Sequence, residues 1–235
     1  MFTGLVREIG RLESVRRSGP RAGIVFSAPR AARDLRAGDS VAVSGICLTV
    51  AAIAGPRVSA DLSAETRRVT TASRWRAGDR LHIEPSLRLG DALGGHFVLG
   101  HVDGVGRVGR VARLEGGLAV TVSAAPAILG RLLPKGSVAI DGVSLTLDAG
   151  PFDRGFTVTL IPLTLRETRF ADLRAGDLVN LEVDVLAKAA GAAAGAAAAA
   201  AAASALVPRA PGPATPLTLE AIAARGWTRR AERRS

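Results

Sequence analysis

The chain has 235 residues, a formal net charge of +10 at pH 7 and 48% hydrophobic residues. This length is enough for two domains of about 100 residues each, with a remainder. No run of about 20 strongly apolar residues is present to span a bilayer, and the first ten residues lack the basic and apolar regions of a signal peptide. We therefore expect a cytoplasmic protein with no membrane partner. Cys47 is the one cysteine, which excludes an internal disulfide and fits a reducing compartment.

The positive charge is spread along the chain rather than gathered in one patch. Lys135 and Lys188 are the two lysines, so arginine supplies almost all of the positive charge. Aromatic residues make up 3% of the chain and leave few platforms on which bases could stack. The densest basic cluster, RGWTRRAERR at residues 225–234, lies in the tail, where a solvated charge run is the usual interpretation. We expect no nucleic-acid partner.

An internal repeat organises most of the chain. The stretch SVAVSGICLTV begins at Ser40, and SVAIDGVSLTL begins at Ser137, at an offset of 97 residues. Near the starts of the two copies, TGLVREIGRL from Thr3 aligns with LGHVDGVGRV from Leu99. The tetrapeptide RAGD also recurs in the second copy, at an offset of 98. One duplication with small insertions explains these offsets.

The predicted elements within each copy are mainly short strands. Apolar runs rich in Val, Ile, Leu and Thr alternate with Gly or Asp turns, which is typical of a small antiparallel barrel or sandwich. Residues 63–70 and 162–169 are each expected to form a short helix or a turn, and residues 125–133 one helix beside the barrel. Closing a sheet into a barrel removes its exposed edges. We predict one barrel over residues 1–93 and its duplicate over residues 94–186.

The remaining residues have a different composition. Residues 187–205 are rich in alanine and favour a helix, although few of their side chains are large enough to fill an interface. Residues 206–235 are rich in Pro and Arg and are expected to form a disordered tail. Within that tail, residues 217–227 have the apolar spacing of one short amphipathic helix, and the sequence leaves open whether it docks on anything.

Six motifs occur in the order that is characteristic of one enzyme family. MFTGLV, GICLTV, GGHFVLGHVDGVG, DGVSLTL, IPLTLRET and NLEVDVLAK follow one another across residues 1–188, and together they resemble the alpha chain of riboflavin synthase. The resemblance implies an all-β fold of two tandem homologous six-stranded Greek-key antiparallel barrels with a C-terminal helix. It also implies a homotrimer, whose active site lies between the N-barrel of one subunit and the C-barrel of its neighbour and holds two lumazines.

The reaction implied by the resemblance is a dismutation. One 6,7-dimethyl-8-ribityllumazine gives four carbons to another, which yields riboflavin and 5-amino-6-(ribitylamino)uracil without a cofactor or a metal. Two copies of one ligand need two similar pockets, which would explain the duplication. The donor and the acceptor need different surroundings, which would explain why Cys47 becomes Ser144, and Ser44 becomes Asp141, in the second copy.

The family's substrate-binding residues fall into two sets on this sequence. The N-barrel set comprises Gly4, Leu5, Val6, Cys47, Leu48, Thr49, Asp61, Leu62, Ser63, Ala64, Glu65 and Thr66. The C-barrel set comprises Gly100, His101, Val102, Lys135, Ser144, Leu145, Thr146, Ile161, Pro162, Leu163, Thr164, Leu165 and Arg166. Backbone groups and hydroxyls suit a pteridine edge rich in donors and acceptors. Asp61 is a candidate partner for the ribityl hydroxyls, and Phe2 and Thr3 would shape the pocket floor.

For the chemistry, the resemblance points to His101, Ser144, Asp184 and Cys47. A proton has to leave the methyl group at C7 of a lumazine, so a base or relay is needed within hydrogen-bond reach. His101 is the candidate base, and Ser144 and Asp184 would polarise or relay. Which of them moves the proton is left open.

Each of these residues also has a structural interpretation. Without the family, Cys47 is a small buried core residue, because free cysteines are usually buried. Ser144 could belong to a cross-strand hydroxyl pair, GGH at residues 94–96 could be only a bend, and Asp184 could cap a helix or pair with an arginine. His96 and His101 lie near Asp103, but three ligands with supporting residues are not apparent, so no metal is expected.

The sequence departs from the family in several places. Ser44 replaces the more usual Asn, Arg67 replaces a common Leu, and Leu163 stands where His or Glu is frequent. The family's C-terminal helix holds the trimer together with large apolar residues, which the alanine-rich C-terminus lacks, so the homotrimer is the least supported of these expectations. The sequence leaves open whether lumazine synthase is a partner. The alternative function is a non-catalytic protein that holds a lumazine or flavin as an antenna. Polar groups retained in both barrels favour the enzyme.

Overall fold

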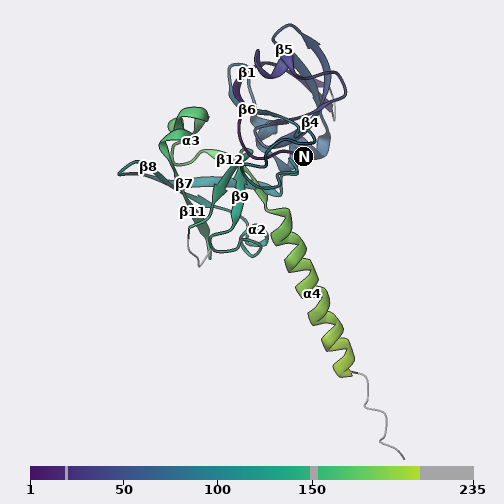
Figure 1. Cartoon of the computed structure of the whole chain (residues 1–235), viewed down its shortest axis with the longest axis vertical. Helices are drawn as coiled ribbons and strands as arrows, with labels where there is room; N and C mark the ends of the chain where they lie inside the picture. The colour runs from purple at the N-terminus through teal and green to yellow at the C-terminus, as the bar shows by residue number, and fades with distance from the viewer. Residues whose placement is uncertain (19–20, 149–152, 207–235) are drawn as a thin grey trace, which may run out of the picture. The chain divides into compact units, whose positions relative to one another are not determined.

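The computed structural model describes residues 1–18, 21–148 and 153–206. The chain divides into one unit of Met1–Ala192 and a second of Ala193–Ser235. The first unit contains two antiparallel β-sheets, one formed by the purple-to-blue strands and the other by the teal-to-green strands (Figure 1). Each sheet has its own apolar core, so each copy of the sequence repeat folds around a separate interior.

The first sheet is a closed barrel of six strands with the order β1-β2-β5-β4-β3-β6. Its strands are β1 (Glu8–Ser18), β2 (Arg21–Ser27), β3 (Ser40–Val43), β4 (Ile46–Ala54), β5 (Arg57–Leu62) and β6 (Arg80–Pro85). Three short helical segments accompany them, namely η1 (Ala31–Arg33), α1 (Ala64–Val69) and η2 (Thr71–Arg74). Alternate strand residues such as Ile24, Val41 and Ile83 fill the interior, as the twofold side-chain period of a strand requires.

The second sheet also has six strands, in the order β10-β9-β12-β7-β8-β11. They are β7 (Gly104–Leu114), β8 (Gly117–Ser123), β9 (Ser137–Ile140), β10 (Val143–Thr146), β11 (Gly155–Leu160) and β12 (Leu178–Val183), with the helical segments α2 (Pro126–Leu129), α3 (Pro162–Glu167) and η3 (Arg169–Asp172). This is the cyclic order of the first barrel, interrupted between β10 and β11. There an isolated bridge joins Leu147 to Val158.

The predicted fold class is confirmed: two homologous six-stranded antiparallel sheets followed by the helix α4 (Val185–Leu206). The Greek-key description stays a prediction. Of the predicted helical segments, 63–70 and 162–169 contain α1 and α3, whereas 125–133 contains only the four residues of α2, which stops at Gly130. The predicted tail falls outside the described residues, apart from Leu206. None of the described helices combines the length and apolar character needed to cross a bilayer.

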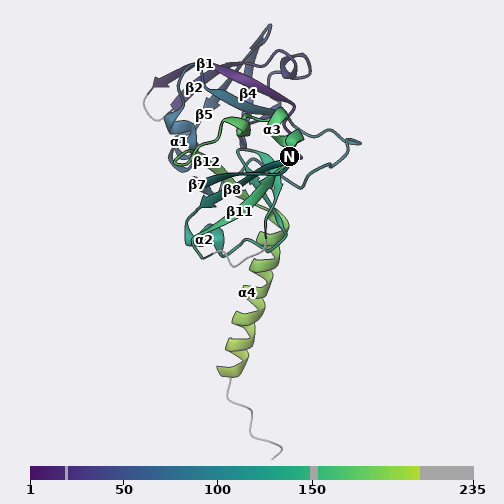
Figure 2. The same cartoon turned by 90° about the vertical axis from the view of Figure 1, so that its left-hand side faces the viewer.

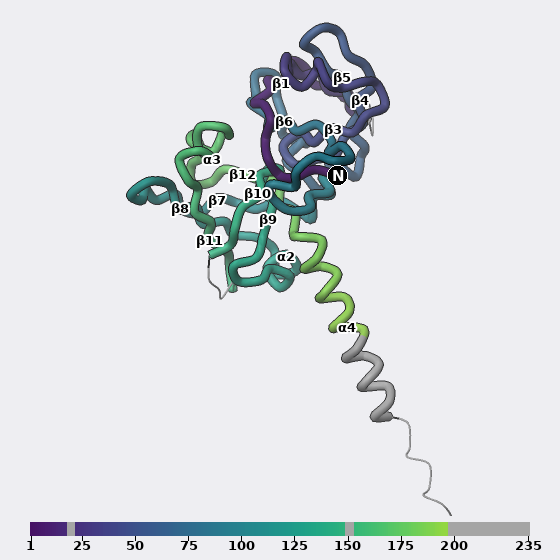
Figure 3. Tube along the Cα trace, in the orientation of Figure 1, coloured from purple at the N-terminus to yellow at the C-terminus, as the bar shows by residue number. Residues whose placement is uncertain are grey.

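The segments that lead into the two sheets cross over. Phe2 and Val98 form an antiparallel bridge, and both are fully buried against Ala42 of β3 and Ala139 of β9. Gly4 then accepts a hydrogen bond from the backbone N–H of β10 in the second sheet. Figure 3 traces the purple N-terminal residues to the junction of the two sheets. Each sheet therefore depends on a segment that belongs, by sequence, to the other copy of the repeat.

Two equivalent polar side chains also connect the sheets. His82 of β6 donates from Nδ1 to the carbonyl of Asp141 (2.9 Å), and its Nε2 accepts from the backbone N–H of Arg169 (2.9 Å). At the equivalent position in β12, Asn180 donates to the carbonyl of Ser44 (2.8 Å) and accepts from the N–H of Thr71 (2.8 Å). Burial lowers the pKa of His82 to about 3, so the ring is neutral at pH 7 and can serve as donor and acceptor at once.

The exchange of Ser44 for Asp141 belongs to this junction. Both residues have a positive φ, and each is followed by a glycine. The backbones of these two glycines, Gly45 and Gly142, lie against each other. Asp141 is fully buried and forms an ion pair with Arg169. Both side chains bond within their own sheets: the Oγ of Ser44 accepts from the N–H of His82 (3.2 Å), and Oδ1 of Asp141 accepts from the N–H of Asn180 (2.8 Å). The interpretation of this exchange as a donor and acceptor difference at the ligands stays a prediction.

Candidate functional site

Two equivalent strands carry polar side chains on their outer faces. In β4, Ile46 and Leu48 point into the core, while Cys47 is half-buried and Thr49 is exposed. In β10, Val143 and Leu145 are buried, Ser144 is half-buried and Thr146 is exposed. Since side chains alternate between the faces of a strand, the predicted residues Leu48 and Leu145 can offer a ligand only their backbone groups. The reactive positions Cys47 and Ser144 lie outside the barrel interiors.

The crossed segments complete these two faces. Cys47 donates its backbone N–H to the carbonyl of Gly100 (2.9 Å), and Ser144 donates its own to the carbonyl of Gly4 (2.8 Å). Both glycines have a positive φ, and a Cβ on either would lie 2.6 Å from the Cβ of the residue it bonds. Glycine is therefore required at both positions, because any larger residue would separate the segment from the strand.

This geometry corrects the predicted grouping of the site residues. Gly4, Leu5 and Val6 were expected with Cys47, but Gly4 bonds Ser144 and Val6 packs against the core of the second sheet. In the same way, Gly100 bonds Cys47 and Val102 packs against the core of the first barrel. The prediction followed the order of the chain, and the crossover of the leading segments reverses it.

The other predicted substrate residues surround the starts of two short helices. Ser63 caps α1, since its Oγ accepts from the backbone N–H of Thr66 (2.9 Å). Asp61, Ala64 and Glu65 are exposed beside it. In the second sheet, Ile161 and Leu163 expose 55% and 51% of their surface around Pro162, the first residue of α3, and Arg166 is exposed nearby. Thr164 and Leu165 are half-buried, Leu62 is buried, and Lys135 is exposed with a positive φ.

The structure separates the two histidines of the GGHFVLGH motif. His101, the predicted base, is exposed, whereas His96 is buried and its Nδ1 lies 2.7 Å from the Oγ of Ser144. Asp184 accepts from the backbone N–H of Leu186 (2.9 Å) and so caps α4, which was its structural interpretation. Sequence reasoning considered His96 only as a metal ligand. The two glycines before it were the available signal of a close approach.

Two buried carboxylates hold the crossed segments in place. Glu84 of β6 accepts from the backbone N–H (2.7 Å) and hydroxyl (2.7 Å) of Thr3 and from the N–H of Gly4 (3.1 Å). Glu182 of β12 accepts from the N–H groups of Leu99 (2.7 Å) and Gly100 (2.9 Å). Burial raises the pKa of both groups, to about 7 for Glu182. Sequence reasoning missed both, although one glutamate occurs at the same place in an apolar strand of each copy.

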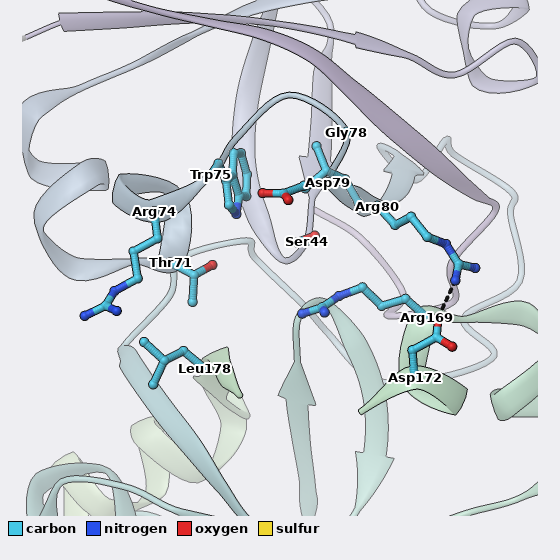
Figure 4. Close-up of a pocket in the computed structure, with 11 residues that line it drawn as sticks. Ser44, Thr71, Arg74, Trp75, Gly78, Asp79, Arg80, Arg169, Asp172 and Leu178 are labelled. Carbon is cyan, nitrogen blue, oxygen red and sulfur yellow. Dashed lines mark hydrogen bonds and ion pairs between the residues drawn. The ribbon is translucent and has the colours of Figure 1, made fainter. Parts of the chain in front are cut away.

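A pocket of about 440 Å³ lies at the junction of the sheets, where Arg80 points toward Asp172 and Arg169 extends below Ser44 (Figure 4). None of the predicted substrate residues lines it. A second pocket, of about 340 Å³, includes Thr3 and Glu84. Figure 2 shows the same two sheets turned by 90°, with the strands β1, β2, β4 and β5 above β7, β8 and β11. Of the predicted substrate residues, Pro162 and Leu165 line a separate pocket of about 390 Å³, and none lines the junction pocket.

Comparison with known proteins first defines the class. The Lumazine binding domain family matches this chain twice, at residues 3–86 and 99–184, which are the two sheets with their crossed leading segments. A solved structure of LumP complexed with 6,7-dimethyl-8-(1'-D-ribityl) lumazine shares the fold, with a TM-score of 0.70 at 22% identity over 78% of this chain and 99% of that one. The chain belongs to the lumazine-binding domain family.

The relatives then narrow the class to one enzyme family. The riboflavin synthase of Brucella abortus (strain 2308) is 38% identical over 197 residues, which cover 81% of this chain and 96% of that one. The riboflavin synthase of Bacillus amyloliquefaciens is 35% identical over 188 residues, covering 80% and 87%. The predicted resemblance to riboflavin synthase, a transferase, is therefore confirmed.

Proposed function

We propose that this chain catalyses the dismutation of two molecules of 6,7-dimethyl-8-ribityllumazine to riboflavin and 5-amino-6-(ribitylamino)uracil. The observation that carries the proposal is the duplicated outer face: a strand with two polar residues, closed by a glycine segment from the other copy. Two equivalent faces suit two molecules of one ligand. The exchange of Cys47 for Ser144 gives the two molecules different neighbours, as a donor and an acceptor require.

The chemistry needs proximity and one proton acceptor. Holding two reactants in contact can lower the activation free energy by about 7–11 kcal/mol. The atoms of two lumazines equal those of the two products, so the reaction consumes no external oxidant or reductant. The polar groups around Ser144 are the ones suited to removing the C7 methyl proton, because that face alone, among the described residues, pairs its hydroxyl with a histidine.

We also propose that the two faces meet between subunits of a homotrimer, with the N-barrel of one subunit opposite the C-barrel of its neighbour. The exposure of Thr49 and Thr146 supports this arrangement, because each face is open to solvent on its own sheet. The exposed apolar residues Ile161 and Leu163 provide surface that a neighbouring ligand or subunit could cover. Native mass spectrometry tests the assembly: a trimer mass is expected, and a single monomer mass at working concentration would refute it.

The direct test of function is to mix the purified chain with the lumazine and to follow the appearance of riboflavin fluorescence. Riboflavin should accumulate with turnover, beyond the amount of protein present. An antenna protein would instead hold the lumazine unchanged, with its fluorescence shifted by binding and no riboflavin in the extract. That second result, obtained with folded protein that binds lumazine, would exclude the proposed reaction.

A further inference from the structure

The segment that closes the Cys47 face is bonded on both of its sides. Gly100 donates its backbone N–H to Oε2 of Glu182 (2.9 Å), and its carbonyl accepts the N–H of Cys47 (2.9 Å). Oε1 of Glu182 accepts the N–H of Leu99 (2.7 Å). Glu182 belongs to β12 of the second sheet, whereas Cys47 belongs to β4 of the first barrel. A carboxylate in one sheet therefore holds the segment that closes the face of the other.

The Ser144 face is closed in the same way, with the two sheets exchanged. Glu84 of β6 accepts the backbone N–H groups of Thr3 (2.7 Å) and Gly4 (3.1 Å), and the carbonyl of Gly4 accepts the N–H of Ser144 in β10 (2.8 Å). Glu84 also accepts the hydroxyl of Thr3 (2.7 Å), a bond that Leu99, the equivalent of Thr3 in the second copy, cannot make. The segment at the Ser144 face is therefore held by one more hydrogen bond than the segment at the Cys47 face.

The two carboxylates are used for nothing else that the structure describes. Glu84 is 5% exposed and Glu182 is 3% exposed, and each accepts hydrogen bonds only from its crossed segment among the described residues. A buried carboxylate is costly to desolvate, and an apolar residue in its place is often as stable or more so. A glutamate at the same place in both copies therefore points to a role in placing the segments rather than in stability alone.

Glu8 provides an internal comparison. It is also buried, and it accepts the backbone N–H groups of Arg30 (3.0 Å) and Ala31 (2.9 Å), where η1 begins. Its chemistry is that of Glu84 and Glu182, a buried carboxylate that holds two successive backbone N–H groups. The segment that it holds contains none of the predicted substrate residues, so Glu8 separates the structural effect of such a carboxylate from an effect on the ligand.

We propose, building on the dismutase function above, that Glu182 positions the lumazine at the Cys47 face and that Glu84 positions the lumazine at the Ser144 face. The residues that directly follow the two held glycines belong to the predicted substrate set, namely Leu5, Val6, His101 and Val102. Because the carboxylate oxygens are occupied by backbone N–H groups, each glutamate acts on its lumazine through the segment. A face binds its ligand only while its segment is in place, so the apparent affinity falls with the fraction of closed segments.

The test replaces each carboxylate by glutamine and observes the two bound lumazines separately. Glutamine keeps the shape and one acceptor oxygen, but its NH₂ group faces the second backbone N–H. Lumazine labelled with ¹³C in its methyl groups should give two bound NMR signals, which Cys47→Ala and Ser144→Ala assign to their faces. Glu182→Gln should weaken binding about tenfold at the Cys47 face alone, as expected for the loss of one hydrogen bond to a charged group. Glu84→Gln should weaken binding at the Ser144 face alone.

The kinetic parameters distinguish positioning from chemistry. Both variants should raise KM, while kcat at saturating lumazine stays within about twofold of wild type, because the loss affects ligand binding and not the chemical step. Glu8→Gln is the matched control. It should lower the urea midpoint as the other two variants do, yet keep both lumazine affinities and KM at wild-type values. Equal losses at both faces in either test variant, or losses of the same size in Glu8→Gln, would overturn the proposal.

Thr3→Val tests the same contact without altering a buried carboxylate. It removes the hydroxyl bond to Glu84 and keeps both backbone N–H bonds, so binding should weaken about threefold at the Ser144 face and stay unchanged at the Cys47 face. Unchanged binding at the Ser144 face in both Thr3→Val and Glu84→Gln would overturn the role of Glu84. Failure of the proposed function has a different signature: a wild-type chain that makes no riboflavin while the two glutamine variants still weaken opposite faces would reject the dismutation and retain the two positioning residues.

Discussion

Replacing Gly100 by alanine should lower the free energy of unfolding by more than the cost of a positive φ, because the added Cβ would also overlap Cys47 of β4. Gly100 has a φ of +75°, and a Cβ there would lie 2.6 Å from the Cβ and 2.7 Å from the backbone N of Cys47. The matched control is Gly176→Ala. Gly176 has a φ of +95°, and a Cβ on it would meet nothing within 4 Å.

The two substitutions share one cost and differ in another. Placing alanine in a left-handed conformation costs about 1–2 kcal/mol at either position. The overlap with Cys47 adds about 1–3 kcal/mol at Gly100, as overpacking a close contact does. We therefore expect the free energy of unfolding to fall by about 2–5 kcal/mol for Gly100→Ala and by about 1–2 kcal/mol for Gly176→Ala.

Urea denaturation of both variants measures this difference, and fluorescence titration with lumazine measures its consequence. The separated segment should weaken binding at the Cys47 face in Gly100→Ala, whereas Gly176→Ala should bind as wild type does. Equal destabilisation of the two variants would show that Gly100 and Cys47 are not in contact. The crossover of the leading segments would then be refuted.

Three further predictions concern the chemistry and the junction. Ser144→Ala or Asp184→Asn should each lower turnover at least about tenfold in the riboflavin assay, and unchanged kinetics in both would remove these residues from the mechanism. Arg169→Leu leaves the carboxylate of Asp141 buried without its cation, so denaturation should show a loss of about 3–5 kcal/mol; a loss below about 1 kcal/mol, as for an exposed ion pair, would contradict this. The folded pKa of His82, about 3, lies below its ordinary value of 6.5, so its contribution to stability is complete above pH 6.5 and is lost as the pH falls toward 3. His82→Asn should flatten that slope, and an identical slope in wild type and variant would be inconsistent with a neutral buried ring.

The strands and their duplication were accessible from the sequence because each is a local pattern. Alternating apolar residues between glycine turns predict a strand without knowledge of its partners, and the repeat from Ser40 to Ser137 shows that the pattern occurs twice. The short helices α1 and α3 were visible for the same reason. In α2, Gly130 ends the helix earlier than the apolar run predicted.

The crossover could not be read in this way, because it is a relation between distant residues. Gly4 lies in the segment that leads into β1 (Glu8–Ser18), and nothing local indicates that it bonds Ser144, about 140 residues later. The same limitation hid the contact of His96 with Ser144, which lies in β10, 48 residues later in the chain. Glu84 and Glu182 were overlooked because a charged residue in a strand is usually solvated, whereas here each accepts the backbone N–H groups of a crossed segment.

The most direct measurement of the whole account is the mass balance of the reaction. Purified protein is incubated with a known amount of 6,7-dimethyl-8-ribityllumazine and no other reactant, and all three compounds are quantified by chromatography over time. The account predicts that two lumazines disappear for each riboflavin formed, with an equal amount of 5-amino-6-(ribitylamino)uracil. Riboflavin that appears without the uracil product, or lumazine that stays bound and unconverted, would contradict the claim that two equivalent faces exchange carbon between identical ligands.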